Sequence, residues 1–596
     1  MKRKKRALSF LLAAVILGIS ACTAAPPVSG GGGYSGSVRT EAQGNNGMVT
    51  VNTTFKDGRI TKVEVLSHGE TPGISDPAIE RIPQNIAAGN TINVDTVAGA
   101  TNTSRAILSA VRDAITQAGL DPNQFMAKAS AGTGRNVELN TDILVIGAGG
   151  AGLSAANIII REGKRVIVLE KMSSVGGATA VSGGGFIGGA SRLQGERGVS
   201  GDSFESIFNN ILKGGEDNYQ PLLRLFAQNI GKTIDWMYYD LRLPIEDGPP
   251  NPFVEYDFAR VFYMKGGPSE ITNSLYRVFR EAGGEVLFET RVMELIVRNN
   301  RVCGAVAEGP GGSRVTVNAE KVILATGGYG NNKELLPPSV SDILYYGPVC
   351  ATGDGLLMAQ DAGAMSWYMD HVKVYPQGIE VSPGIGRVAT GASMVTTNTT
   401  SAIYVNARGD RVINENEDFV SIKLKTMEQP ERMIYILMDQ AAFTAWRNAG
   451  PPLLSHTDID RFVAQNGGVP MFANAPTIEG AARIAGIDPA RLQATVDRFN
   501  GFVRAGQDAD FGRTQLFPIG QGPYYLIEHK LRFASTLGGL KINDNMQVLT
   551  AADRPIEGLY AAGEIVGGVH GKESMPACNV GWALTSGRLA GLSVVK

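Results

Sequence analysis

VIGAGGAG, residues 145 to 152, decides the fold of this chain, because it follows the apolar run Asp142 to Ile146 and continues into AGLSAANIII, a segment compatible with a helix. Its glycines Gly147, Gly149 and Gly152 have separate tasks. They allow a tight turn after the strand, close approach of the backbone to a pyrophosphate, and room for the helix to lie on the strand. The positive end of that helix would then attract the pyrophosphate.

A second strand supports this interpretation. The apolar segment RVIVL, Arg165 to Leu169, is typical of the next buried parallel strand. Glu170 closes it about 20 residues beyond the glycine motif, where an acidic side chain can accept from the ribose hydroxyls of an adenosine. The two strands therefore predict an α/β fold with an adenine-dinucleotide site.

Length and charge narrow the class of protein. With 596 residues, the chain is long enough for about three domains, each with its own core. Charged residues make up 19% of the chain and the net charge is −2, which argues against a nucleic-acid partner and favours a small molecule. Cys303, Cys350 and Cys578 have no disulfide or metal-ligand spacing, so we expect buried thiols and no metal site.

The N-terminus predicts export. Basic residues Lys2 to Arg6 precede the apolar run Leu8 to Ile19, which is too short to be a comfortable transmembrane helix. The ending Ile19-Ser20-Ala21-Cys22 resembles that of a bacterial lipoprotein signal peptide, here residues 1–22. The resemblance implies cleavage that leaves a lipidated Cys22 as the N-terminus, at the extracytoplasmic face of the cell membrane. The alternative is an ordinary secretory signal with an incidental cysteine. The Pro, Ser and Gly content of residues 23–33 indicates a flexible tether.

Residues 34–120 are predicted to form a small α+β unit, followed by a linker at 121–138. Met48 to Phe55 and Ile60 to Leu66 alternate in the manner of strands, and the turn Lys56 to Arg59 between them predicts a hairpin. Ser104 to Ala118 has the pattern of an amphipathic helix.

The segment DTVAGATNT, Asp95 to Thr103, resembles the flavin-attachment site of the FMN-binding domains in sodium-pumping quinone reductase subunits and flavocytochrome-c-like reductases. That motif, Asp-x-x-Ser/Thr-Gly-Ala-Thr, implies an FMN linked covalently to Thr101 by a flavin transferase. Ala98 departs from the usual Ser or Thr. The alternative is a Gly-Ala turn that caps the next helix through Thr103 or Ser104.

From Leu139 to the C-terminus the chain resembles the FAD-dependent fumarate reductase and succinate dehydrogenase flavoprotein superfamily. The motifs that carry this resemblance are VGGATAVSGGGF (175–186), KVILATGG (321–328), ATGDGLLMAQDA (351–362) and GLYAAGEIVGGVHG (558–571). The resemblance implies a Rossmann-like FAD-binding domain in two parts, 139–365 and 526–596, with an inserted α+β capping domain at 366–525. It also implies non-covalent FAD held by Gly147, Gly149, Gly152, Glu170, Thr179, Gly184, Gly185, Asp354 and Glu564.

The charged positions of fumarate reductases are replaced here. Those enzymes hold a dicarboxylate with cationic side chains, and an arginine delivers the proton. The replaced positions in this chain are Tyr375-Pro376-Gln377 for His-Pro-Thr, the uncharged segment Met394 to Asn398, Phe419 for the proton-donating arginine, Ser535 for a histidine, and Glu573 to Ala577 for Asn-Arg-Leu-Gly-Gly. We therefore expect a less charged or aromatic substrate, and not fumarate.

Tyr375 is the first candidate for polarising the substrate or delivering a proton. It matches a tyrosine of urocanate reductase relatives, which share the FMN-plus-FAD domain order; the alternative is an aromatic side chain packed at the domain seam. Lys423, Arg387 and Arg411 are further candidates as proton donors or carboxylate partners. The alternative for Arg411 is an ion pair with Glu415.

The resemblance thus implies an exported reductase of an activated C=C bond, with urocanate-like, cinnamate-like or other enoates and enones as substrates. Electrons would pass from an extracytoplasmic cytochrome, quinol or flavoprotein to FMN, to FAD and to the substrate, in anaerobic respiration. Two alternatives stay open: a flavin dehydrogenase of a ketone-conjugated ring, and a non-catalytic flavin electron-transfer protein.

Overall fold

The computed structural model describes residues 33–45, 47–70, 74–97, 99–127, 136–449 and 454–596. The predicted signal peptide, Cys22, residues 23–32 of the tether and most of the linker's second half lie outside these residues. Within the described ranges, no helix is long and apolar enough to cross a membrane. The three cysteines in these ranges are free; Cys578 is buried as expected, whereas Cys303 and Cys350 are only half-buried.

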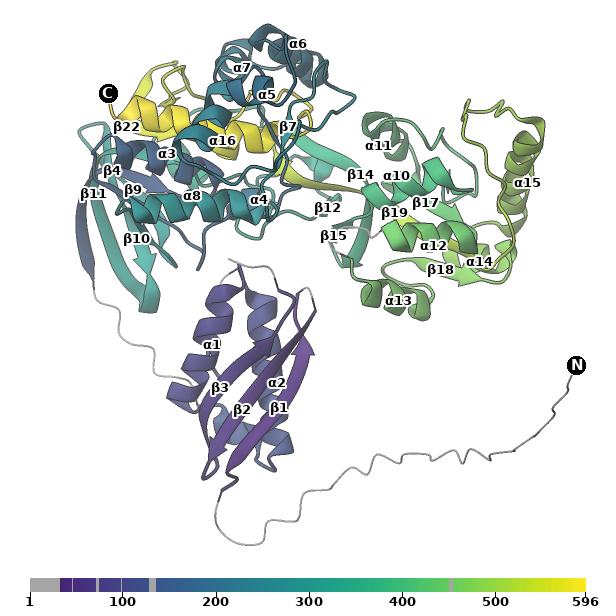
Figure 1. Cartoon of the computed structure of the whole chain (residues 1–596), viewed down its shortest axis with the longest axis horizontal. Helices are drawn as coiled ribbons and strands as arrows, with labels where there is room; N and C mark the ends of the chain where they lie inside the picture. The colour runs from purple at the N-terminus through teal and green to yellow at the C-terminus, as the bar shows by residue number, and fades with distance from the viewer. Residues whose placement is uncertain (1–32, 46, 71–73, 98, 128–135, 450–453) are drawn as a thin grey trace, which may run out of the picture.

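The N-terminal unit is a three-stranded antiparallel sheet covered by two helices (Figure 1). The predicted hairpin is confirmed as β2 (Met48–Lys56) and β3 (Arg59–Ser67). An unpredicted strand, β1 (Gly36–Gln43), pairs with β2 at the edge of the sheet. The helices are α1 (Asp76–Gly89) and α2 (Thr101–Gln117), followed by a short turn η1 (Pro122–Phe125), so α2 begins three residues before the predicted start.

The glycine motif lies at the centre of a larger sheet whose strands follow the order β21-β22-β10-β11-β4-β5-β8, with β9 paired to β10. The two predicted strands are confirmed as β4 (Val137–Ile146) and β5 (Val166–Leu169), which pair in parallel. The other strands are β8 (Glu285–Leu287), β9 (Arg291–Arg298), β10 (Arg301–Gly309), β11 (Ser313–Leu324), β21 (Gln547–Leu549) and β22 (Pro555–Ala561).

Helices cover this first sheet and complete its core. The helix after the glycine motif, α3 (Gly150–Arg161), packs against α16 (Cys578–Val594) and α8 (Ser269–Glu281). The close approach of α16 requires Gly587, because a Cβ there would lie 2.1 Å from the Ala151 carbonyl oxygen. The remaining elements of this region are α4 (Gly177–Ala180), β6 (Phe186–Ile187), α5 (Arg192–Glu196), α6 (Phe204–Gly215), α7 (Gln220–Asp235), η2 (Trp236–Asp240), β7 (Val261–Phe262), η3 (Pro310–Gly312), η4 (Pro338–Val340), α9 (Asp354–Asp361) and η6 (Gly563–Ile565).

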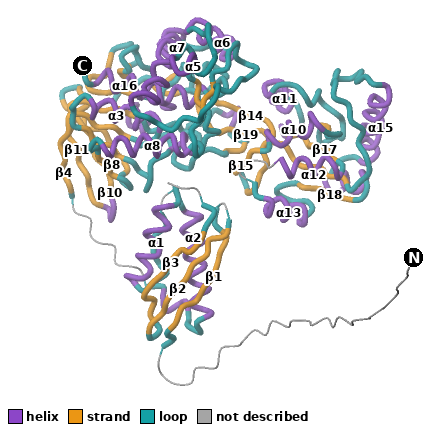
Figure 2. Tube along the Cα trace, in the orientation of Figure 1, coloured by secondary structure: helices purple, strands orange, loops and turns teal. Residues whose placement is uncertain are grey.

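A second sheet is built from the middle of the chain and has the order β12-β15-β14-β19-β17-β16, with β18 paired to β19 (Figures 1 and 2). Its strands are β12 (Leu344–Tyr345), β14 (Val372–Ser382), β15 (Ile385–Val388), β16 (Ile403–Val405), β17 (Met433–Met438), β18 (Phe472–Ala475) and β19 (Tyr524–Thr536). Its helices are α10 (Thr390–Thr399), α11 (Phe419–Met427), η5 (Pro430–Arg432), α12 (Gln440–Ala449), α13 (His456–Gln465), α14 (Ile478–Ala485) and α15 (Pro489–Ala505).

The chain leaves this second sheet later than the return predicted at Tyr525. Strand β19, which starts there, is the antiparallel partner of β14 and β17 and so belongs to the second sheet. Short strands β13 (Ser366–Trp367) and β20 (Gly539–Leu540) pair with each other. The chain therefore enters and leaves the insertion at neighbouring positions. The backbone hydrogen bonds of β19 place the exit near Gly539, and the sequence pattern does not reveal this pairing.

The turn between β4 and α3 shows why its three glycines differ. A Cβ at Gly147 would lie 2.3 Å from the Ala325 carbonyl oxygen, and one at Gly152 would lie 1.9 Å from the Gly147 carbonyl oxygen. The nearest atom to a Cβ at Gly149 is 3.8 Å away, so this position is open. Gly147 and Gly152 are thus required by the fold itself, whereas the space over Gly149 is left for a ligand, as the motif predicts.

These distances predict different effects for two alanine variants. Gly152→Ala should destabilise the folded state by about 3 kcal/mol or more, because the methyl group overlaps the Gly147 carbonyl. Gly149→Ala should leave the thermal midpoint of the flavin-free protein within about 2 °C of the parent and yet reduce its FAD content, since only the bound pyrophosphate meets the methyl group. Thermal unfolding with and without FAD, together with the flavin absorbance of the purified variants, measures both effects. Equal loss of FAD-free stability in the two variants would contradict this division of tasks.

Candidate functional site

One cavity of ≈580 Å³ runs along the carboxyl ends of β4, β5 and β11 and reaches the second sheet. It is lined by most of the predicted cofactor residues: Gly147, Gly149, Glu170, Thr179, Gly184, Gly185, Asp354 and Glu564. Gly152 lies behind the turn and is not among the lining residues. Helices α3 and α16 both begin at this cavity, and neither N-cap residue supplies a side-chain cap, so the positive end of each helix faces the space that a ligand would fill.

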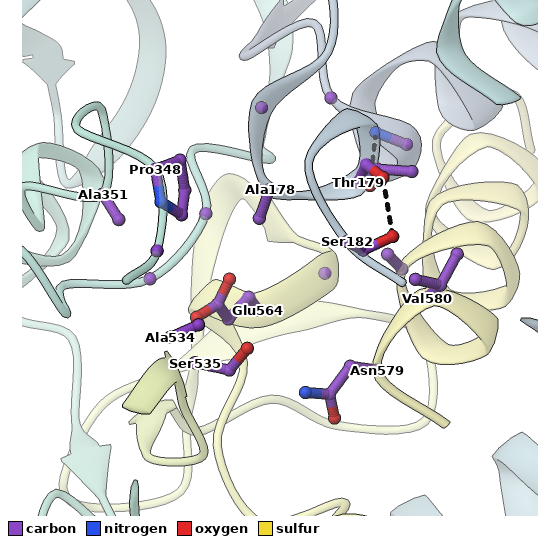
Figure 3. A pocket seen from close by; sticks show the side chains of 18 of the residues that line it. Ala178, Thr179, Ser182, Pro348, Ala351, Ala534, Ser535, Glu564, Asn579 and Val580 are labelled. Atoms are coloured by element: carbon purple, nitrogen blue, oxygen red, sulfur yellow. Dashed lines mark hydrogen bonds between the residues drawn. The ribbon is translucent and has the colours of Figure 1, made fainter. Parts of the chain in front are cut away.

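Helix α4 is fixed against the glycine turn, and the segment that follows it is bonded back to α4 (Figure 3). Thr179 Oγ1 accepts a hydrogen bond from the Gly150 N–H at 3.3 Å, and Ser182 Oγ donates to the Thr179 carbonyl at 2.8 Å. Gly184 has a φ of +78°, which an L-residue would adopt only with strain. These contacts give the cavity a wall of small residues.

Two carboxylates mark the adenosine end of the cavity. Glu170 accepts hydrogen bonds from the backbone N–H groups of Ala148 at 2.7 Å and Met172 at 2.8 Å, and its burial raises the pKa of the carboxyl despite these bonds. Each oxygen keeps a second lone pair for a ribose hydroxyl. Burial alone would raise the pKa of Asp354, but hydrogen bonds from Arg291 and Lys171 lower it overall, and they hold this side chain at the start of α9.

Glu564 lies at the opposite end, beside the second sheet. Its carboxylate accepts from the Thr536 N–H at 3.0 Å, and burial raises its pKa to about 7. Together with the open space over Gly149 and the uncapped helix ends, this set of donors and acceptors fits an FAD molecule. FAD is therefore the cofactor that this cavity is built to hold.

Thr101 lies in the N-terminal unit, apart from this cavity, at the first residue of α2. It is partly exposed, and its hydroxyl has no hydrogen-bond partner among the described residues. Ser104 Oγ accepts from the Val97 N–H at 3.0 Å and donates to the Ala100 carbonyl at 2.9 Å, so it closes the preceding loop. The N-cap residue Ala100 has no side-chain cap, and neither Thr103 nor Ser104 caps the helix as the alternative required.

Tyr375 lies in the cavity wall formed by β14. Its ring is flanked by two cations, with Lys373 Nζ 4.8 Å and Arg532 Cζ 4.9 Å from the ring centroid. Tyr346 meets it edge-on at 6.4 Å. Burial raises the pKa of the Tyr375 hydroxyl well above its usual value. The tyrosine therefore stays protonated over the whole physiological range.

Arg532 lines the cavity but belongs to none of the sequence motifs. It lies opposite Tyr375 in the pairing of β14 with β19. His570 also lines the cavity, and burial together with the Lys373 charge lowers its pKa to about 3, so its ring is neutral. The positions where fumarate reductases carry cationic side chains are replaced here, but Arg532 on β19 brings a positive charge to the cavity from a position outside those motifs. An arginine within the otherwise apolar segment LRFA, residues 531–534, was the available signal.

The other predicted catalytic candidates lie behind the wall. Lys423, on α11, forms an ion pair with Glu573 at 2.5 Å, and Glu573 in turn contacts Lys373. Arg411 forms a two-bond pair with Glu415 at 2.7 and 2.8 Å and a third bond to Asp508 at 2.8 Å, as its alternative predicted.

Neither Lys423 nor Arg411 is among the residues that line the cavity, and Arg387 on β15 is not either. The side chain of Arg387 donates to the Gly386 carbonyl at 3.2 Å. Of the predicted catalytic candidates, the structure therefore brings only Tyr375 to the cavity.

Comparisons with known proteins agree with this geometry. The urocanate reductase of Eggerthella lenta is 31% identical over 576 residues, which cover 92% of this chain and 90% of that protein. The open conformation of a flavocytochrome c3 fumarate reductase is 29% identical, covers 77% of this chain and 78% of its own, and superposes with a TM-score of 0.64. A 3-ketosteroid dehydrogenase of Sterolibacterium denitrificans has a TM-score of 0.65 over 76% of this chain and 99% of its own, but at 20% identity it shares the fold alone.

The match to family models covers both flavin units. Residues 44–116 match the FMN-binding domain, and residues 142–580 match the FAD binding domain. The similar proteins that share its sequence are flavin-dependent reductases of C=C bonds, which also speaks against the dehydrogenase and non-catalytic alternatives. The chain belongs to the FAD binding domain family, as a flavin-dependent oxidoreductase acting on CH–CH groups in which an FMN-binding domain precedes the FAD-binding domain.

Proposed function

We propose that this chain reduces the activated C=C bond of a planar unsaturated compound of the urocanate or cinnamate kind. The observation that carries the proposal is the continuity of one cavity from the FAD cradle at Gly149 to the wall that holds Tyr375. Bound FAD would supply the hydride equivalent. The chain's own residues would hold the substrate, keep water away and provide the proton.

The proton donor in this proposal is Tyr375. A tyrosine with a raised pKa is a weak acid, so it needs neighbours that favour the tyrosinate at the moment of transfer. Lys373 and Arg532 lie within 5 Å of its ring centroid and supply positive charge there. Burial, and next the charge of Lys423, lower the pKa of Lys373 to about 7.

Replacing Tyr375 by Phe should lower the turnover number by about 10²- to 10⁴-fold, because the ring and its cation contacts remain but the acidic proton is lost. Turnover of urocanate and cinnamate with a reduced viologen dye as electron donor measures the effect. Tyr346→Phe, which changes the neighbouring ring in the same way, is the matched control and should be far less affected. Undiminished turnover in the Tyr375 variant would remove this residue from the mechanism.

The pH dependence of turnover follows from Lys373. Below its pKa of about 7 the lysine is charged and favours the tyrosinate; as the pH rises through that value the charge is lost, so the rate should fall on the alkaline side. Lys373→Arg keeps the positive charge at high pH, so the decline of the rate should shift to higher pH. Identical pH profiles for the parent and this variant would contradict the role of Lys373.

Electrons are proposed to enter through FMN attached to Thr101, from an extracytoplasmic cytochrome, quinol or flavoprotein. The match of residues 44–116 to the FMN-binding domain supports this attachment, as does the partial exposure of Thr101, whose hydroxyl has no hydrogen-bond partner among the described residues. A flavin transferase would make the phosphoester bond.

Denaturing gel electrophoresis should show a fluorescent flavin band that Thr101→Ala abolishes while the non-covalent FAD remains. Thr96→Ala, an exposed threonine of the same loop, is the matched control and should keep the band. Persistence of fluorescence in the Thr101 variant would place the covalent flavin elsewhere.

The proposed location is the extracytoplasmic face of the cell membrane, through a lipid on Cys22. The sequence Ile19-Ser20-Ala21-Cys22 after a short apolar run supports it. Cys22→Ser should move the protein out of the washed membrane fraction or leave the signal uncleaved, since two or more acyl chains anchor far better than one. An unchanged membrane fraction with a shortened, serine-starting chain would count against lipidation.

A further inference from the structure

The cavity holds one guanidinium whose environment lacks a counter-ion. Arg532 is 3% exposed, and its Nη2 donates a hydrogen bond to Thr390 Oγ1 at 2.7 Å. Its Nε is buried without a partner. Among the described residues, no carboxylate lies within ion-pair distance of this side chain.

Other deeply buried arginines of the chain are treated differently. Arg260, which is 0% exposed, forms two bonds to Asp202 at 2.6 and 2.8 Å. Arg513, which is 2% exposed, pairs with Glu415 at 3.1 Å and donates to backbone carbonyls. An unpaired buried charge is costly in free energy. Since Arg260 and Arg513 are paired and Arg532 is not, we infer that the partner of Arg532 is an anion that binds from solution.

Two aromatic rings hold the Arg532 guanidinium in place. Its Cζ lies 4.4 Å from the ring centroid of Tyr346 and 4.9 Å from that of Tyr375, both cation–π distances. The two rings offset part of the cost of removing the guanidinium from water. They provide no negative charge to accept hydrogen bonds from its N–H groups. A planar fork of this kind matches a carboxylate, which accepts two parallel hydrogen bonds.

The rest of this end of the cavity is uncharged or already paired. The lining side chains Ser535, Ser574, Asn579 and Met575 are neutral, and His570 is neutral because burial lowers its pKa. The cations Lys171 and Arg291 lie at the other end and are bonded to Asp354. Lys373, beside the Tyr375 ring, contacts Glu573 and is not among the lining residues, so Arg532 is the one cation that the lining of this end presents to a carboxylate among the described residues.

We propose that Arg532 binds the carboxylate of the substrate, which makes this chain selective for unsaturated monocarboxylates over neutral enones and over dicarboxylates. This inference rests on the proposed function, since it names the substrate class of the same cavity. Tyr346 and Tyr375 position the guanidinium and offer flat surfaces to a conjugated chain or ring. Thr390 fixes the Nη2 end of the fork.

The test compares a carboxylate with its neutral amide, in binding and in turnover. Cinnamate and cinnamamide are titrated into the oxidised holoenzyme, with the change in flavin absorbance as the readout, and urocanate and fumarate are compared in the same way. The parent should bind cinnamate on the order of 10²-fold more tightly than cinnamamide, the value expected for a charge-assisted two-bond contact. It should bind cinnamate more tightly than fumarate.

Arg532→Gln should lose this preference, with weaker binding of cinnamate and unchanged binding of cinnamamide. Arg532→Lys keeps the charge but not the planar fork, and should retain part of the preference. Arg498→Gln, a variant of an exposed arginine paired with Asp510, is the control and should match the parent. FAD content and the thermal midpoint check that each variant is folded. If the Gln variant does not fold, the inference is tested by the Lys variant and by the ratio of the parent's affinities for cinnamate and cinnamamide.

Two outcomes would overturn the inference. One is a parent enzyme without a preference for acids, which either binds the amide and the acid equally well or reduces enones and vinyl phenols but no acid. The proposed reduction of a C=C bond would then stand without the carboxylate contact. The other is a Gln variant that keeps the preference for cinnamate. If the parent binds 3-phenylpropionate through Arg532 but reduces no unsaturated compound, the carboxylate site stands and the proposed function fails.

Discussion

Antiparallel pairing of β14 with β19 is the constraint on which the site depends. The register places Tyr375 opposite Arg532 and Lys373 opposite Ser535, so that side chains separated by more than 150 positions in sequence share one face. The pairing shifts by one residue between Lys373 and Val374, which leaves Ala534 as the extra residue of a bulge. Because a bulge turns consecutive residues toward the same side, both Ala534 and Ser535 line the cavity. A second irregularity after Tyr375 accommodates Pro376, which has no N–H to give to the ladder.

Charge is distributed around the cavity in two distinct ways. At the adenosine end, Glu170 accepts hydrogen bonds from backbone N–H groups and Asp354 is paired with Lys171 and Arg291. The charges of these side chains are therefore compensated. At the other end positive charge is in excess, with Arg532 unpaired and Lys373 and Lys423 sharing the single carboxylate of Glu573. Anionic ligands and anionic transition states are both stabilised by such an excess among buried side chains, where the effective dielectric constant is low. The same site therefore binds an acid and favours the transient charge of a tyrosinate.

Local steric requirements explain what the sequence predicts well. Gly147 and Gly152 are dictated by backbone carbonyls within their own strand–turn–helix unit and its neighbouring strand, so the motif identifies the FAD cradle directly. The edge strand β1 escapes prediction because its inward positions, Gly36, Val38, Thr40 and Ala42, hold mostly small or polar residues and so give no clear apolar alternation. Arg532 and the exit near Gly539 depend on the pairing of distant strands, and a bulge of one residue changes which side chains face the cavity. Comparison with family motifs detects the positions where arginines are missing, but not an arginine supplied by a different position.

The pairing of β13 with β20 gives the insertion a narrow attachment to the rest of the molecule. Since Trp367 lies opposite Gly539, the segment between them starts and finishes at one point on the edge of the FAD-binding region. A unit joined in this way can be exchanged or remodelled without altering the strands that carry the glycine turn. Tyr375, Lys373 and Arg532 all lie within it, whereas Glu170 and Glu564 lie outside. Changes within this stretch can therefore alter most of the side chains that would meet the substrate, while the glycine turn stays as it is; β12 and Tyr346, which precede the stretch, complete the second sheet and the wall.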